Sequence, residues 1–238
     1  ADLARIWNKF LRGAPLPRVL AEVRTVGIPK DDGTDRPISL AQLLWRLANT
    51  CVIDRLVSWI DKWAPEELAG GLRGRSPEEI YAYLAAEIDA AHRSGAAFSA
   101  CKEDVEKAFP SIRIEIALLV LERCGLPPGM ITYLKEFYGK LEHWFEAEGA
   151  VAPESTAPEV GALQGCPFSC LLIAAVMSVW AMGMRQVDGI TTKVYVDDGV
   201  VGATSDTPER ELAEWAPRRS AGSPAAPGQA AVRLHHHH

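Results

Sequence analysis

A long run without charge is the feature that most constrains this chain. The residues from Val160 to Met184 include no Asp, Glu, Lys or Arg. Such a run is long enough to cross a bilayer, so a membrane helix is one alternative. A helix buried on all sides in a protein core has the same signature. Gly161, Gln164 and Pro167 interrupt the run and no basic cluster flanks it, so we expect a buried helix from Pro167 to Met184.

Composition places the rest of the chain among globular proteins. Of its 238 residues, 48% are hydrophobic and 24% are charged, which predicts a sizeable core in one or two subdomains. The net charge of -6 argues against a protein that holds nucleic acid by a diffuse positive field. Five cysteines without a C-x-x-C pair, and no signal peptide, favour reduced thiols in an intracellular, nuclear or cytoplasmic compartment.

Two helices are predicted in the first hundred residues. Leu40 to Trp63 carries apolar residues at helical spacing, and we expect its stripe to be core. The stripe consists of Leu40, Leu43, Leu44, Leu47 and Cys51, continued by Leu56, Trp59, Ile60 and Trp63. Ser76, Pro77 and Glu79 form a helix start with a capping box, so a second helix runs to about His92 and ends before Gly95.

Later segments alternate between strands and helices. The predicted elements are a strand over Ala97–Val105, helices over Ile112–Arg123 and Pro128–Tyr138, a hairpin over Lys140–Val151, a hairpin over Thr191–Ala203, and a helix from Thr207 to about Trp215. After Ala216 the sequence holds almost no large apolar residue, which predicts disorder to the end of the chain. The run from His235 to His238 is typical of an affinity tag.

The second of these hairpins carries adjacent carboxylates at its tip. Apolar residues alternate up to Asp197, and Asp198 precedes Gly199, a strong hairpin signal. A solvated turn is the ordinary interpretation of such a tripeptide. A third carboxylate upstream, Asp104, makes a metal site the alternative, because hard divalent cations prefer carboxylate oxygens.

Four segments in this order resemble a reverse transcriptase. They are Val26–Ser39, Lys102–Phe109, Gly161–Ser169 and Lys193–Val201. The resemblance implies an α+β fold with right-hand polymerase architecture, in which an antiparallel palm sheet packs on helices. It places fingers at 1–96 with 124–160, the palm at 97–123 and 161–205, a truncated connection toward a thumb at 206–216, and a tail at 217–238.

The resemblance assigns the carboxylates to metal binding and catalysis. Asp104, Asp197 and Asp198 would hold two Mg²⁺ ions, for which Mn²⁺ is a possible substitute, together with the Val105 carbonyl. Tyr195 would position the primer. The reaction would add deoxynucleoside triphosphates to the 3′-hydroxyl of a DNA primer along an RNA template.

Other residues would bind the nucleotide. Lys30 and Arg36 would clamp its phosphates, Phe109 would exclude a 2′-hydroxyl, and Gln164 with Gly165 would lie near nucleotide and template. Each has an ordinary alternative: the charges lie on a solvated hairpin, Phe109 is core, and Gln164 begins a plain turn. An RNA-dependent RNA polymerase is disfavoured by Phe109 and Gln164.

Within the family, these motifs look most like non-LTR retrotransposon or group II intron enzymes. Two departures stand out: no Lys follows Lys193, where the family supplies a candidate general acid, and there is no length for a thumb. We therefore expect the fingers and palm of a larger or degenerate retroelement protein, with further domains missing. The alternative is a catalytically silent remnant that retains the fold.

Overall fold

The computed structural model describes residues 2–29, 31, 33, 35–105, 107–147, 149–158, 160–215 and 231–234. The chain divides into two compact units. The first comprises Ala1–Trp63 with Lys107–Val176, and the second comprises Ala64–Glu106 with Met177–His238. This division differs from the predicted fingers and palm in two places. Residues 64–96 join the unit that contains the acidic hairpin, and residues 107–123 and 161–176 join the other unit.

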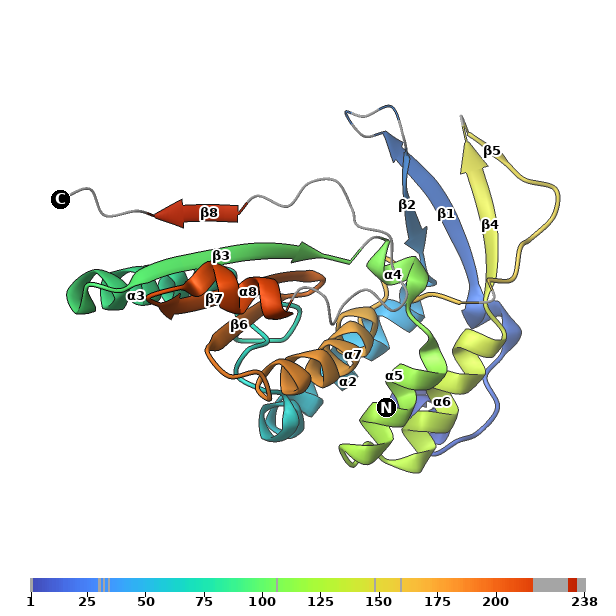
Figure 1. The fold of residues 1–238 in the computed structure, drawn as a ribbon. Coiled ribbons are helices and arrows are strands. Elements are labelled where there is room, and N and C mark those ends of the chain that lie inside the picture. The colour runs from blue at the N-terminus through green and yellow to red at the C-terminus, as the bar shows by residue number, and fades with distance from the viewer. Residues whose placement is uncertain are drawn as a thin grey trace. The chain divides into compact units, whose positions relative to one another are not determined.

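A four-stranded sheet lies at one end of the first unit (Figure 1). Its strands are β1 (Glu22–Pro29), β2 (Asp35–Leu40), β4 (Glu142–Ala147) and β5 (Ala150–Val151), in the order β2-β1-β4-β5. The pairs β1–β2 and β4–β5 are antiparallel, the second as the hairpin predicted over Lys140–Val151 requires, whereas β1 and β4 are parallel. The parallel pair joins segments over a hundred residues apart, and no local pattern predicts it.

Helices and an aromatic core complete this unit. The helices are α1 (Asp2–Leu11), α2 (Leu43–Trp63), α4 (Ala108–Ser111), α5 (Ile114–Arg123), α6 (Pro128–Gly139) and the first half of α7 (Ser169–Met184), with a 3-10 turn η1 (Arg18–Ala21) before β1. Trp45 on α2 is fully buried and stacks on Phe137 of α6 at a ring-centroid distance of 3.6 Å. Tyr133 also stacks on the Trp45 ring, at a ring-centroid distance of 5.0 Å. These rings form the centre of the unit.

The predicted core stripe of α2 is wrong in its first half. Leu43, Leu44 and Leu47 are 65%, 48% and 57% exposed, Leu40 before the helix is 45% exposed, and Cys51 is exposed too. The helix instead buries Trp45, Asn49 and Ile60. Two faces of α2 carry apolar residues, and the face that holds the large aromatic ring faces the core because it buries the greater area.

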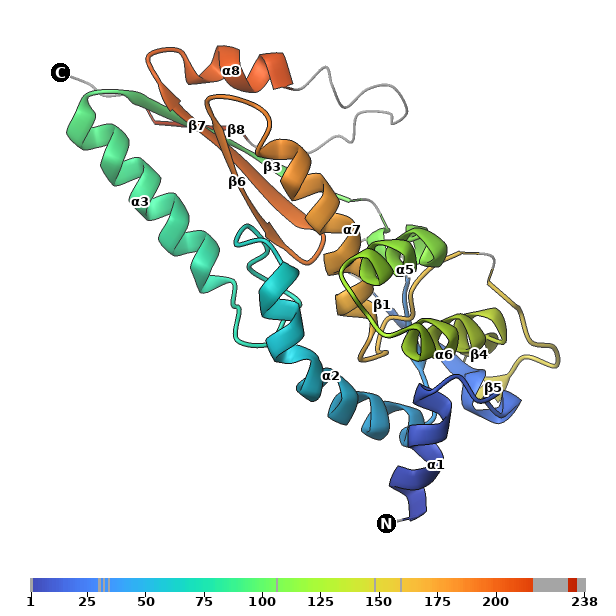
Figure 2. The ribbon, with the colours of Figure 1, turned by 90° about the horizontal axis from the view of Figure 1, so that it is seen from below.

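The second unit is a sheet with helices on both faces. Its strand order is β6-β7-β3-β8, from β6 (Ile190–Tyr195), β7 (Asp198–Ser205), β3 (Ala97–Asp104) and β8 (Ala231–Leu234), all antiparallel. Helix α3 (Glu78–Ser94) runs along one face, as Figure 2 shows, and bonds β6 through Tyr83 and Thr191. The end of α7 and helix α8 (Pro208–Trp215) pack on the other, around Val201.

Most predicted elements are confirmed within a few residues. Helix α3 ends at a left-handed Gly95, and the Glu79 carboxylate accepts the Ser76 amide hydrogen as the predicted capping box requires. Helix α7 begins two residues later than predicted, and no described helix is long and apolar enough to cross a membrane. Of the tail for which we expect disorder, only the strand β8 is described; the remainder, with the His run, lies outside the described residues.

Candidate functional site

The acidic hairpin of the second unit has a strained two-residue turn. Tyr195 ends β6 directly opposite Asp198, which begins β7, so Val196 and Asp197 make the turn. Val196 has a φ of 59°, in the left-handed region that a β-branched residue rarely adopts. Such strain costs about 1–3 kcal/mol and persists only where the surrounding structure holds it, commonly at functional sites. The turn therefore fixes the direction of the Asp197 and Asp198 carboxylates.

Three carboxylates act on one another around this turn. Asp104 at the end of β3 is the direct cross-strand partner of Asp198. The pKa of Asp197 is raised, chiefly by burial and further by repulsion from Asp198 and Asp104. Val105 follows the end of β3 and is 41% exposed. The donors are hard oxygens, and their mutual repulsion is relieved by a cation, so their chemistry fits Mg²⁺ or Mn²⁺.

Lys102 is a member of this group that the sequence reasoning missed. Its ammonium lies 2.9 Å from Asp198, and that hydrogen bond raises the pKa of Lys102, with attraction to Asp198, Asp104 and Asp197 adding to the effect. In the described part of the chain, no three His, Cys, Asp or Glu side chains converge as a ready metal cage. Lys102 lies two residues before Asp104 on a strand, so the same-face spacing could have revealed it.

Four of the predicted nucleotide-binding residues are described, and all four belong to the first unit: Arg36, Phe109, Gln164 and Gly165. Half-buried Phe109 lies on α4, and its carbonyl accepts the Ala162 amide hydrogen at 2.7 Å. Gly161 lies so close to Pro110 that an added Cβ would be 2.9 Å from its carbonyl oxygen. The short helix α4 and the segment that leads to Gln164 therefore pack against each other.

Gln164 and Gly165 in turn lie against β2. The Ser39 amide donates to the Gln164 carbonyl at 3.1 Å, and a Cβ on Gly165 would be 2.8 Å from the Ser39 carbonyl. Gly165 also has a φ of 112°, so only glycine fits this turn. The Gln164 side-chain oxygen is buried and has no hydrogen-bond partner among the described residues. Arg36 is exposed on the same strand β2, while Lys30 lies outside the described residues.

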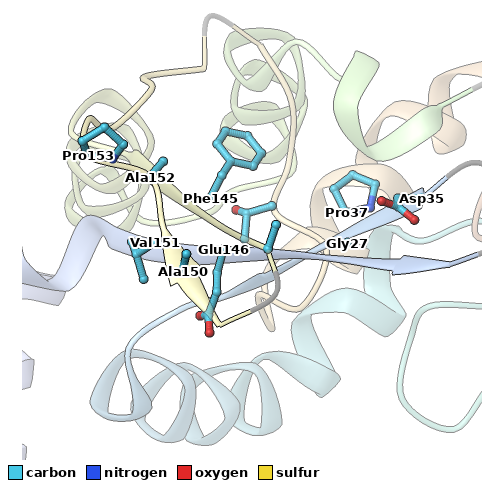
Figure 3. A pocket seen from close by; sticks show the side chains of 11 residues that line it. Gly27, Asp35, Pro37, Phe145, Glu146, Ala150, Val151, Ala152 and Pro153 are labelled. Carbon is cyan, nitrogen blue, oxygen red and sulfur yellow. The ribbon is translucent and has the colours of Figure 1, made fainter.

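A cavity of about 680 Å³ lies on the sheet of the first unit (Figure 3). Gly27, Asp35 and Pro37 line one side, and β4, β5 and the residues that follow line the other, with the Phe145 ring standing between. Asp35 lines it with a carboxylate, whereas the Glu146 carboxylate is paired with Arg24 at 2.8 Å. The hollow is lined mostly by apolar residues, and sequence reasoning did not predict it.

A smaller cavity of about 200 Å³ shares Phe145 and reaches Gln164. Its polar wall is a chain of bonds in which Thr25 contacts Ser39 at 3.1 Å and His143 Nδ1 at 2.8 Å. Burial lowers the pKa of His143, so its ring is neutral near pH 7. The neutral His143 ring and the unpaired Gln164 side-chain oxygen suit a flat polar ligand better than a charged one.

Comparison with known families decides the identity of these segments. Residues 28–216 match the family model described as reverse transcriptase (RNA-dependent DNA polymerase). The chain belongs to the reverse transcriptase family. The match covers most of the chain, including the acidic hairpin and the Gln164 turn.

Solved structures show the same fold. Apo telomerase from Candida tropicalis truncated from its C-terminal domain aligns with a TM-score of 0.65 and 9% identity, over 99% of this chain and 55% of that one. Telomerase from Candida albicans in complex with a TWJ fragment of telomeric RNA aligns with 0.59 and 11%, over 91% of this chain and 43% of that one. The chain thus spans about half the length of these proteins, and at this identity the likeness concerns the fold.

The structure therefore groups the predicted site residues into two sets. The second unit holds Asp104, Val105, Asp197, Asp198 and Tyr195 around one turn, and the first unit holds Arg36, Phe109, Gln164 and Gly165 on docked segments. The fold class predicted from the sequence, an α+β reverse transcriptase with an antiparallel palm sheet, is confirmed.

Proposed function

We propose that this chain is the fingers and palm part of an RNA-directed DNA polymerase from a retroelement, nearest in its motifs to the non-LTR or group II intron type. One observation carries the proposal: Asp104 and Asp198 are directly opposite on paired strands, with Asp197 in the adjoining turn, in a chain of the reverse transcriptase family. The proposed partners are an RNA template, a DNA primer and deoxynucleoside triphosphates, without a membrane. The relative that was solved with an RNA fragment supports an RNA partner.

Asp104, Asp197 and Asp198, with the Val105 carbonyl, would hold two divalent cations, Mg²⁺ or Mn²⁺. When bound, these ions would supply the Lewis acidity that activates the primer hydroxyl and neutralises the leaving group. The protein's own part would be to hold the carboxylates in fixed positions, and the paired strands and the strained turn support this role. Tyr195, at the end of β6, would position the primer end.

The first unit would bind the nucleotide. Exposed Arg36, with Lys30, would clamp the phosphates, and Phe109 would fill the space beside the sugar 2′ position. The unpaired Gln164 oxygen would accept a hydrogen bond from the nucleotide or template base, since a buried acceptor without a partner costs about 1–3 kcal/mol. Gly165 allows close backbone approach.

A primer-extension assay tests the proposal. A primed RNA template is incubated with Mg²⁺ and either deoxynucleotides or ribonucleotides, with the unchanged chain and with Asp197→Asn. We expect deoxynucleotide incorporation that the substitution reduces by at least about a thousandfold, since it removes a group that acts on the reacting atoms. Incorporation that survives Asp197→Asn would contradict the metal assignment.

A catalytically silent remnant is the second candidate, and one observation favours it. Lys102 pairs with Asp198 where a ready metal cage is not formed among the described residues. For this candidate we expect a folded chain that binds primer-template and adds nothing. Preferential use of ribonucleotides would instead favour an RNA polymerase and contradict the assignment of Phe109.

A further inference from the structure

A short segment before α3, Glu66–Arg75, forms an additional edge of the second unit's sheet; we call it the edge segment. Leu68 pairs in parallel with Val194 on β6. The Ala69 amide donates to the Val194 carbonyl at 2.6 Å, and the Val194 amide donates to the Glu67 carbonyl at 2.7 Å. In Figure 2 the chain that leads into α3 accordingly passes beside β6. The edge segment thus covers the otherwise open side of the strand that ends in Tyr195.

The Tyr195 ring lies directly against the backbone of Gly70. A Cβ placed on Gly70 would be 2.2 Å from Tyr195 Cδ2 and 2.6 Å from two more ring atoms. No side chain fits there unless the ring moves. Gly70 is not among the glycines with positive φ, so glycine is required for space and not for backbone conformation. Gly70 therefore sets where the ring two residues before Asp197 is located.

Three cationic side chains fix the edge segment in place. The Arg75 guanidinium donates to the carbonyls of Pro65, Leu68 and Ala64 at 2.5, 2.6 and 3.1 Å. Lys193 donates to the Glu66 carbonyl at 2.7 Å, and Arg185 pairs with the Glu67 carboxylate through two nitrogens. The middle of the segment, Leu68 and Ala69, is almost fully buried. A loop held by this many hydrogen bonds is rigid enough to position its neighbours.

We propose that the edge segment is a positioning element for the acidic turn, with Gly70 and Arg75 as its positioning residues. It holds the end of β6 from the open side through two backbone hydrogen bonds and holds the Tyr195 ring through contact with Gly70. The strained Val196 and the carboxylates of Asp197 and Asp198 follow directly in the chain. This inference rests on the proposed function, in which these carboxylates bind divalent cations.

Gly70→Ala tests the proposal, with Gly183→Ala as the matched control. Gly183 lies on α7 with no other atom within 4 Å of an added Cβ, so the same methyl group meets open space there. The measurement is the dissociation constant for Mn²⁺ alone, from the electron paramagnetic resonance of free Mn²⁺, with thermal unfolding to check the fold. We expect Gly70→Ala to weaken Mn²⁺ binding roughly tenfold, as misplacing the supports of metal ligands does, and Gly183→Ala to leave it unchanged.

A rescue separates positioning from a general loss of structure. In the background of Tyr195→Ala the ring is gone, so Gly70→Ala is expected to change the Mn²⁺ affinity by less than about twofold. An equal loss in both backgrounds would contradict the role assigned to the ring contact. If Gly70→Ala does not fold, Arg75→Gln replaces it, because it removes carbonyl bonds and adds no bulk. Weaker Mn²⁺ binding in Arg75→Gln, partly restored by Arg75→Lys, is then expected.

The outcomes distinguish this inference from the function on which it rests. Mn²⁺ binding that Asp197→Asn abolishes, but that Gly70→Ala and Arg75→Gln leave unchanged, would overturn the positioning role and leave the metal site standing. An unchanged chain with no Asp197-dependent Mn²⁺ binding would overturn the proposed metal site and the positioning role together.

Discussion

At the scale of single residues, the acidic turn is governed by charge balance. Three carboxylates repel one another, burial adds to the cost of ionising Asp197, and Lys102 offsets part of it. The lysine therefore has two opposite effects on cation binding: its charge lowers the pKa of Asp197, and it competes for Asp198. We expect the competition to be the larger effect at pH 8.

Lys102→Gln is expected to tighten Mn²⁺ binding about threefold to tenfold at pH 8, because one positive charge within a few ångströms of the ion is removed. Calorimetric titration of Mn²⁺ measures this. The matched control is Lys9→Gln, an equal charge change on the exposed side of α1, which should leave the affinity unaltered. Weaker binding in Lys102→Gln would show instead that the lysine mainly supports the ionised carboxylates.

His143 gives the first unit a dependence on pH. Burial lowers its pKa in the folded chain, so on acidification the unfolded chain takes up the proton first. The stability that His143 contributes is therefore present above the ordinary histidine pKa and is lost as pH falls below it. We expect the urea midpoint of the unchanged chain to fall more between pH 7.5 and pH 5 than that of His143→Gln. Equal losses would contradict this.

At the scale of elements, local patterns predicted more than distant ones. The hairpin of β6 and β7 and the helices α3, α5 and α6 follow from periodicity, turn residues and caps that lie within each segment. The orientation of α2 did not follow, because periodicity identifies an apolar stripe and not the partner it meets. Trp45 turns the helix toward Phe137 and Tyr133, and the leucine stripe is left outside.

The candidate site shows the same difference between what local patterns and distant contacts allow to be predicted. Asp197 and Asp198 could be predicted from one local pattern, and Asp104 through the resemblance of its motif. The edge segment could not, because its pairing with β6 rests on backbone hydrogen bonds, which any sequence without proline can make. The run of glycines at Gly70, Gly71 and Gly74 was the one available signal of close packing.

Two substitutions on α2 test the corrected orientation. Trp45→Ala is expected to lower the free energy of unfolding by about 3–5 kcal/mol, because it empties the centre of the aromatic core. Leu47→Ala, only two residues along on the exposed face, should cost about 0.5 kcal/mol or less. Guanidinium unfolding followed by circular dichroism measures both. Similar losses for the two variants would show that the leucine stripe is buried after all.

At the scale of the whole molecule, the charge of -6 bears on the proposed binding of nucleic acid. The chain lacks a surplus of Lys and Arg from which to build many phosphate contacts, so the proposed binding would depend on a few local ones such as Arg36. The proposed partners would then bind with a weak dependence on salt.

We expect fewer than about five phosphate contacts with a primer-template. The logarithm of the association constant, plotted against the logarithm of the salt concentration, should therefore have a slope shallower than about -4.5. Fluorescence anisotropy of a labelled duplex between 50 and 200 mM salt, roughly the range over which such slopes are resolved, measures it. Arg36→Gln should make the slope shallower by about one contact. A slope of about -6 or steeper would indicate a basic surface that the composition does not predict.

The strained Val196 has a consequence for laboratory evolution of this protein. Glycine tolerates the left-handed conformation that valine resists, so Val196→Gly should relieve the backbone and raise the melting temperature. A selection for heat resistance alone would therefore favour glycine between Tyr195 and Asp197. The same change makes the backbone between Tyr195 and Asp197 more flexible. A library selected in this way would therefore be enriched in heat-resistant variants that lack the proposed polymerase activity.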